Sequence, residues 1–113
     1  MTVLEVKEAL GAHVLTQGTD LNRTVNEGYS CDLLSWVMAH GREGMAWITV
    51  QTHMNVIAVA SLHDMSCVII PENIHMEDDV LAKATEEGIT VLSSELTAFD
   101  ISGRLYAAGI GAC

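Results

Sequence analysis

The sequence predicts a single α/β domain of three layers, α/β/α, in which helices cover both faces of a largely parallel sheet. Short apolar segments that are typical of buried strands alternate along the chain with segments of helical periodicity. The segment 66–70 is an apolar strand without interruption, as expected where both faces of a sheet are covered. Helix-length segments between the strands indicate right-handed βαβ crossovers. No linker, repeat or low-complexity stretch divides the chain, so residues 1–113 are expected to form one domain.

The amino-terminal helix is recognised by the signals at its two ends. Thr2 and Glu5 have the spacing of a capping box, in which each side chain accepts a hydrogen bond from the backbone N–H of the other residue. Gly11 can adopt the left-handed conformation that ends a helix. We therefore expect a helix over residues 2–10, followed by a short strand at 13–16.

A second strand is expected within residues 23–29, where the sequence Asn-Glu-Gly at 26–28 could instead form a bulge or a turn. A helix then opens at Ser30 or Cys31. Asp32 is expected in its first turn, where a negative charge suits the helix dipole. The apolar stripe of this helix comprises Leu33, Leu34, Val37 and Met38.

The centre of the chain combines a buried strand at residues 45–50, a short polar break and a second apolar segment at 55–63. The second segment has the Val and Ile content of a strand, but its alanines and the strand that follows closely favour a helix. Only five residues are aromatic, so aliphatic side chains and methionine must form most of the core. Trp36 and Trp47 are expected to be its two large anchors.

The last third of the chain predicts a helix, a strand and a helix. Acidic residues at 77–79 start the first helix and Gly88 ends it. Residues 90–92 predict the strand, and Ser94 with Glu95 is expected to cap the final helix. One face of that helix comprises Phe99, Tyr106 and Ile110 together with Gly103, which would allow close packing against the sheet.

Charge and cysteine content exclude several classes of protein. The net charge is −10 and the five Lys and Arg residues are scattered, whereas nucleic acids and anionic membranes require clustered cations. Three cysteines without a C-x-x-C pair favour a reducing compartment over a disulfide framework. Since no signal peptide and no bilayer-spanning apolar run is found, the chain is expected to be cytoplasmic.

Polar side chains are expected to gather beyond the carboxyl ends of the strands, where α/β sheets bind ligands. The candidate ligand-binding residues are Gln51, Thr52, His53, Asn55, Glu72, Asn73 and Ser30. The same rim would include Cys31, Asp32, Ser93 and Ser94. Helix capping accounts for most such side chains, and Thr52 is expected to cap the helix that follows it. His53 is set apart because capping does not need an imidazole; it could bind a proton, a metal or an anion, or simply be exposed or hydrogen-bonded.

Metal binding and catalysis have no positive signal. The five His and three Cys residues show no spacing typical of a metal site, so neither a metal nor a cofactor is expected. Cys31, beside a helix N-terminus, could be a reactive thiolate, whereas Cys67 is expected to be buried and inert. No phosphate-binding loop and no nucleophile elbow is present, so we do not expect an enzyme, and no kinase activity in particular.

From Leu4 to Tyr106, the order and spacing of the segments resemble those of a DRTGG domain. The segments that carry the resemblance are Asp-Leu-Leu-Ser-Trp-Val-Met at 32–38, Trp-Ile-Thr-Val-Gln-Thr-His at 47–53, Asn-Val-Ile-Ala-Val-Ala at 55–60, Val-Ile-Ile at 68–70 and Phe-Asp-Ile-Ser-Gly-Arg-Leu-Tyr at 99–106. The resemblance covers nearly the whole chain, so the chain looks like a stand-alone member of this family. The sequence departs from the family where Thr52-His53 replaces an Asp-Arg pair and Pro71-Glu72-Asn73 replaces a Thr-Gly-Gly-like turn.

The resemblance implies a fold like the N-terminal domain of HPr kinase/phosphorylase, which is the half of that protein without the phosphate-binding loop. It also implies a dimerising, regulatory role, since DRTGG domains accompany CBS domains in nucleotide-regulated pyrophosphatases and occur in phosphotransacetylases. We therefore expect a non-catalytic cytosolic homodimer, with Trp36 and Met38 as candidate interface residues. The alternative is a sensor of a nucleotide or another small anion that binds around Thr52, His53 and Asn73.

Overall fold

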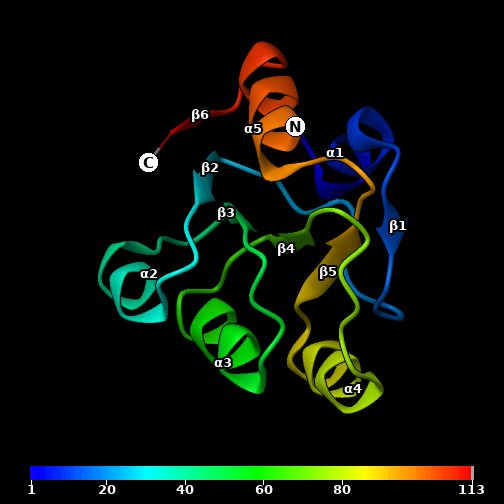
Figure 1. The fold of residues 1–113 in the computed structure, drawn as a ribbon, viewed down its shortest axis with the longest axis vertical. Helices are drawn as coiled ribbons and strands as arrows, with labels where there is room; N and C mark the ends of the chain where they lie inside the picture. Colours follow the sequence, from blue (N-terminus) through cyan, green and yellow to red (C-terminus); the bar gives the residue numbers. More distant parts are fainter. Residues whose placement is uncertain (113) are drawn as a thin grey trace.

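A computed structural model describes residues 1–112 and shows five helices and six strands in that range. The helices and strands are, in order, α1 (Val3–Leu10), β1 (His13–Val14), β2 (Glu27–Ser30), α2 (Leu34–His40), β3 (Met45–Ile48), α3 (Met54–Leu62), β4 (Cys67–Ile70), α4 (Asp78–Glu87), β5 (Thr90–Ser93), α5 (Ala98–Ala107) and β6 (Gly111–Ala112). Figure 1 shows the predicted three layers, with α1 and α5 on one face of the sheet and α2, α3 and α4 on the other.

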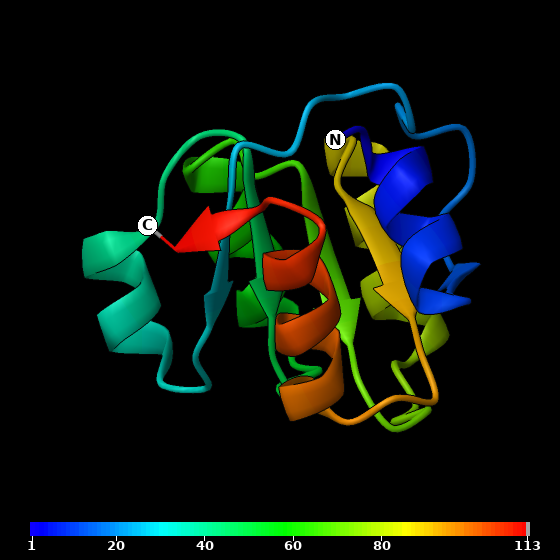
Figure 2. The same cartoon turned by 90° about the horizontal axis from the view of Figure 1, so that it is seen from above.

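The six strands form one sheet in the order β1-β5-β4-β3-β2-β6. All neighbouring strands are parallel except β1, which runs antiparallel to β5 at one edge. Figure 2 shows the crossover helices between the parallel strands. The α/β class and the largely parallel sheet are therefore confirmed.

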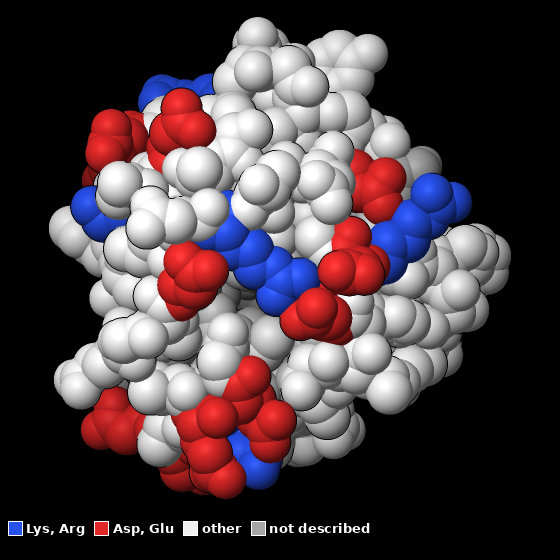
Figure 3. All heavy atoms as spheres, turned by 180° about the vertical axis from the view of Figure 1, so that it is seen from behind, with Lys and Arg blue, Asp and Glu red and all other residues white. Residues whose placement is uncertain are grey.

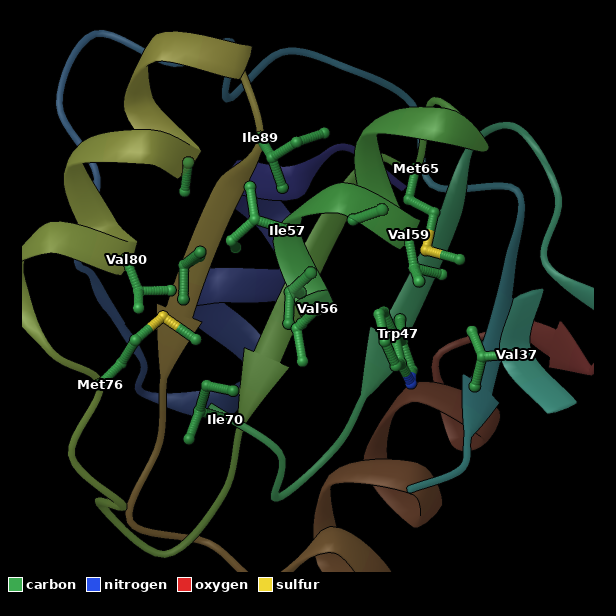
Figure 4. Packing of buried hydrophobic residues seen from close by; sticks show 14 of the residues in the cluster. Val37, Trp47, Val56, Ile57, Val59, Met65, Ile70, Met76, Val80 and Ile89 are labelled. Atoms are coloured by element: carbon green, nitrogen blue, oxygen red, sulfur yellow. The ribbon is translucent and has the colours of Figure 1, made fainter. Parts of the chain in front are cut away.

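The central strands β3, β4 and β5 are buried along their whole length. Successive side chains of a strand point to opposite faces, so each strand supplies both layers of the core. Trp47, Val68 and Val91 belong to the cluster beneath α2, α3 and α4, which Figure 4 shows from close by. Ile48, Ile69 and Leu92 belong to the cluster beneath α1 and α5. Apolar runs without alternation are the expected sequence of such strands.

The two tryptophans differ, and only one is an anchor. Trp47 is fully buried, and its indole Nε1–H donates to the backbone carbonyl of Cys31 at 2.8 Å. Trp36 is 54% exposed on α2 and stacks on His40, with the ring centroids 4.4 Å apart. The expectation that Trp36 anchors the core is therefore wrong.

Several expectations about element ends are also corrected. Helix α2 begins at Leu34, so Asp32 precedes the helix and does not lie in its first turn. Within its expected stripe only Val37 is buried, while Leu33 is 61% and Met38 43% exposed. Strand β2 includes Glu27 and Gly28, which could have formed a turn. The edge strand β6 was not expected, because two residues next to glycines carry no strand pattern.

Helix α5 is oriented differently from the prediction. Its N-cap is Thr97, whose hydroxyl accepts from Asp100 N, and not Ser94 with Glu95. Its buried residues are Ile101 and Leu105, whereas Phe99 is 87% and Tyr106 74% exposed. Gly103 is exposed, and a Cβ there would meet nothing within 4 Å, so it does not serve close packing.

Replacement of Trp47 by alanine should cost about 3–5 kcal/mol of unfolding free energy, because it empties the centre of the core and leaves the Cys31 carbonyl without its donor. Tyr106→Ala, at a residue of α5 that is 74% exposed, is the control and should change the free energy by about 0.5 kcal/mol or less. Urea denaturation followed by circular dichroism, at one fixed protein concentration, measures both. Equal costs for the two variants would contradict the packing described above.

Candidate functional site

The carboxyl edge of the sheet carries a groove of about 410 Å³ between the start of α3 and the start of α4. It is lined by Val50, Gln51, Thr52, His53, Met54, Glu77, Asp79 and Val80. Strands β3 and β4 are parallel neighbours, so the loops that follow them, and the helices that those loops open, lie side by side. This is the position at which α/β sheets bind ligands.

His53 is the N-cap of α3. Its Nδ1 atom accepts the backbone N–H of Asn55 at 3.1 Å, which satisfies one of the free donors at the helix start. An accepting Nδ1 places the ring proton on Nε2, which is left as a donor at the exposed side of the ring. The expectation that Thr52 caps this helix is wrong, because the imidazole itself does so.

Asp32 holds the loop after β3, which contributes Val50 and Gln51 to the lining of the groove. One of its carboxylate oxygens accepts from the Thr49 hydroxyl at 2.8 Å and from Val50 N at 2.9 Å. The amide of Gln51 donates to the backbone carbonyl of Asp32 at 3.1 Å, so the two loops are joined in both directions. Asp32 therefore shapes the path of the chain after β3.

The other candidate residues lie away from this groove. Asn55 lines a separate groove between α2 and α3. The Ser30 hydroxyl pairs with that of Ser102 on α5, with the two oxygens 2.7 Å apart, on the opposite side of the sheet. Glu72 and Asn73 adopt positive φ angles of 57° and 52° in a turn after β4. Their backbone N–H groups donate to the loop between β5 and α5, and neither side chain lines the groove.

The acidic side chains Glu77 and Asp79 complete the groove, and sequence reasoning missed them as site residues. They were assigned only to the first turn of a helix. Their position next to Thr52 and His53 follows from the pairing of β3 with β4. The groove thus combines neutral hydrogen-bonding groups with two carboxylates, a combination that favours uncharged or cationic groups over phosphates.

Cys31 and Cys67 are free thiols in different surroundings. No group of three His, Cys, Asp or Glu side chains within residues 1–112 could hold a metal ion. Burial raises the pKa of the Cys67 thiol to about 12, so this group stays protonated and inert at neutral pH. The Cys31 thiol is half-buried, and its Sγ lies 3.9 Å from the carbonyl oxygen of Leu33.

Every buried polar side-chain atom in residues 1–112 has a hydrogen-bond partner, so none is left over for a ligand. The longest helices described there have ten residues, and none could cross a bilayer.

The role of His53 as a cap predicts how its replacements behave. His53→Ala should lower the free energy of unfolding by about 1 kcal/mol, because the N–H of Asn55 loses its acceptor. His53→Asn should retain the full stability or exceed it, since asparagine is among the best N-cap residues. Urea titrations of the three proteins measure the difference. A loss of stability as large with asparagine as with alanine would show that the imidazole does more than cap the helix.

Comparison with known proteins gives a family, and among solved structures it gives a regulatory region of similar fold. A model of the DRTGG domain matches residues 5–108. The crystal structure of the CBS and DRTGG domains of the regulatory region of Clostridium perfringens pyrophosphatase, complexed with its activator diadenosine tetraphosphate, superposes with a TM-score of 0.70 at 14% identity.

That superposition covers 92% of this chain and 45% of the other, so this chain spans less than half the length of the pyrophosphatase region. No curated protein matches the sequence. The identity of 14% establishes the fold and nothing further. The match over residues 5–108 includes well over half of the sequence, and the chain therefore belongs to the DRTGG domain family.

Proposed function

We propose that this chain is a regulatory module without catalytic activity of its own, which self-associates as a homodimer in the cytosol. The observation that carries the proposal is the use of the polar side chains at the carboxyl edge of the sheet. His53 caps α3, Asp32 holds the loop after β3, and Ser30 pairs with Ser102. Three of the polar side chains at this edge thus serve the fold, which supports a structural over a catalytic role for them.

The family and the structural neighbour support the regulatory part of the proposal. The matched DRTGG domain of the Clostridium perfringens protein belongs to the regulatory region of a pyrophosphatase. The shared fold supports a similar role for this chain, in which the domain responds to or joins another component.

Exposed apolar side chains support the self-association. Leu33, Trp36 and Leu62 are each more than half exposed on α2 and α3, and Phe99 is almost fully exposed on α5. Single exposed apolar residues are ordinary, but several on neighbouring helices mark surfaces that other proteins cover.

Light scattering coupled to size-exclusion chromatography should report about twice the mass of 12.2 kDa at micromolar protein concentration. Burial of the exposed apolar side chains is the expected driving force, so the dimer should persist in 0.5 M salt. A mass of one chain at all concentrations up to 100 μM would contradict the self-association.

Binding of a nucleotide or another small anion is the second candidate function. The groove at the carboxyl edge favours it, because Thr52, the Nε2–H of His53 and the amide of Gln51 offer hydrogen bonds to a ligand. The carboxylates of Glu77 and Asp79 oppose it, since they would repel phosphate groups. A ligand would therefore place a neutral part, such as a base or sugar, against these side chains.

Thermal denaturation with 1–5 mM ATP or diadenosine tetraphosphate tests this second function. Binding to the folded state should raise the melting temperature. His53→Asn should reduce the shift while keeping the helix cap, and Glu77→Gln should enlarge it by removing one repelling charge. Absence of any shift in the wild-type protein, or equal shifts in all three proteins, would argue against the groove as a nucleotide site.

A further inference from the structure

The outer surface of α2 and α3 is uncharged in a strongly acidic protein. Residues 33–41 and 50–63, which include both helices, contain no Asp, Glu, Lys or Arg, although the chain carries 15 acidic residues and a net charge of −10. Figure 3, which looks along the helix axes, shows the contrast at the helix ends, with acidic side chains at α4 on the lower left and an uncharged surface at α2 and α3 on the lower right. We call this outer surface the α2–α3 face. Its central exposed residues are Ser35, Met38, Asn55, Ala58 and Leu62.

The α2–α3 face has the relief of a helix-packing surface. A groove of about 270 Å³ runs between α2 and α3 and is lined by Leu34, Ser35, Met38, Asn55, Ala58 and Val59. A second groove of about 300 Å³ lies between α3 and α4, at the border of this face, where Lys83 and Glu87 of α4 form its far wall. Ala58 lines both grooves, so the exposed side of α3 around this small side chain forms a ridge between two channels. Ridges and grooves of this kind are how helices from two layers interlock.

The face is held in place within the chain. The Nε2 atom of His63, at the end of α3, lies 2.8 Å from the carbonyl oxygen of Met38 on α2. Gly41 follows α2 and lies so close to His63 that a Cβ there would be 2.7 Å from the imidazole Cδ2. The carboxyl ends of the two helices are therefore joined, and little conformational freedom is left to lose when a partner docks.

The distribution of charged side chains over the surface bears on which partner the α2–α3 face would bind. Two copies that each carry −10 repel, and contact through α4 would oppose its five carboxylates to those of the second copy. These carboxylates are Glu77 at the N-cap and Asp78, Asp79, Glu86 and Glu87 within the helix, and Lys83 pairs with the last two. The α1 and α5 layer carries the acidic residues Glu5, Glu8 and Asp100 together with the basic residues Lys7 and Arg104, so charge alone does not exclude a contact there, and a variant on α5 has to test it. A basic partner would instead be drawn to α4, because the α2–α3 face offers it no carboxylate.

We propose that a second copy of this chain docks on the α2–α3 face, so that each α2 lies in the partner's groove between α2 and α3 about a two-fold axis. The inference rests on the proposed self-association and names the surface that performs it. A two-fold contact uses the same patch on both copies, as a self-complementary ridge and groove allow. The carboxylates of α4 then lie at the margin of the interface, where solvent screens them.

Three alanine-to-glutamate variants test the surface. Ala58→Glu puts a charge at the centre of the α2–α3 face, Ala82→Glu makes the same change on the outer side of α4, and Ala107→Glu makes it on α5. All three alanines are exposed helical residues, and glutamate is a good helix former, so each monomer should remain folded by circular dichroism. Ala58→Glu should weaken dimerisation by about 100-fold or more, since it buries an unpaired charge in the interface.

Ser35→Glu is a second variant in the same groove, and its charge in the first turn of α2 suits the helix dipole. It should also give monomers by light scattering, while Ala82→Glu and Ala107→Glu should remain dimers. Dimers of Ala58→Glu and Ser35→Glu alongside monomers of Ala107→Glu would place the contact on α5, which overturns this inference and leaves the self-association intact. A monomeric wild-type protein would overturn both.

Discussion

The burial of strand β3 on both faces is the constraint on which the rest of the structure depends. Its four residues are almost completely removed from solvent, and the parallel neighbours β2 and β4 use its backbone hydrogen bonds. Side chains on the two sides of such a strand require cover from two helical layers. Trp47 adds a link within one layer, since its indole N–H holds the carbonyl of Cys31 and so ties β3 to the connection between β2 and α2.

The elements that the sequence predicted well are those with strong end signals or complete burial. The capping box of Thr2 and Glu5 and the left-handed Gly88 are both present, because they act within a few residues of the chain. The failures lie where tertiary pairing decides. Strand β6 forms only because Gly111 and Ala112 lie beside β2, and a two-residue strand has no pattern of its own. The start of α5 was misplaced because serine is by residue type a better N-cap than threonine, whereas the structure uses Thr97 and not Ser94.

The candidate site was predicted in part for a related reason. Gln51, Thr52 and His53 are consecutive and follow one strand, so they gather in the groove whatever the order of the sheet. Glu77 and Asp79 join them only because β4 pairs with β3. The order of the elements along the sequence does not show which strands pair, and so does not show which loops become neighbours. The capping role of His53 was also hidden, since it depends on which ring nitrogen faces the N–H of Asn55 and not on the residue type.

The exposure of α2 follows from the widths of the layers. Of the five parallel strands, β6 is only two residues long, so the longer strands β5, β4, β3 and β2, about 5 Å apart, give a platform roughly 15–20 Å wide. Three helices packed side by side need about 25–30 Å at the usual 8–10 Å between axes. The outermost of the three, α2, therefore packs beside α3 and extends past the sheet, with Val37 as its only buried residue in the described chain. Its apolar side chains have helical spacing, but apart from Val37 and the partly buried Leu34 they extend beyond the core and stay exposed.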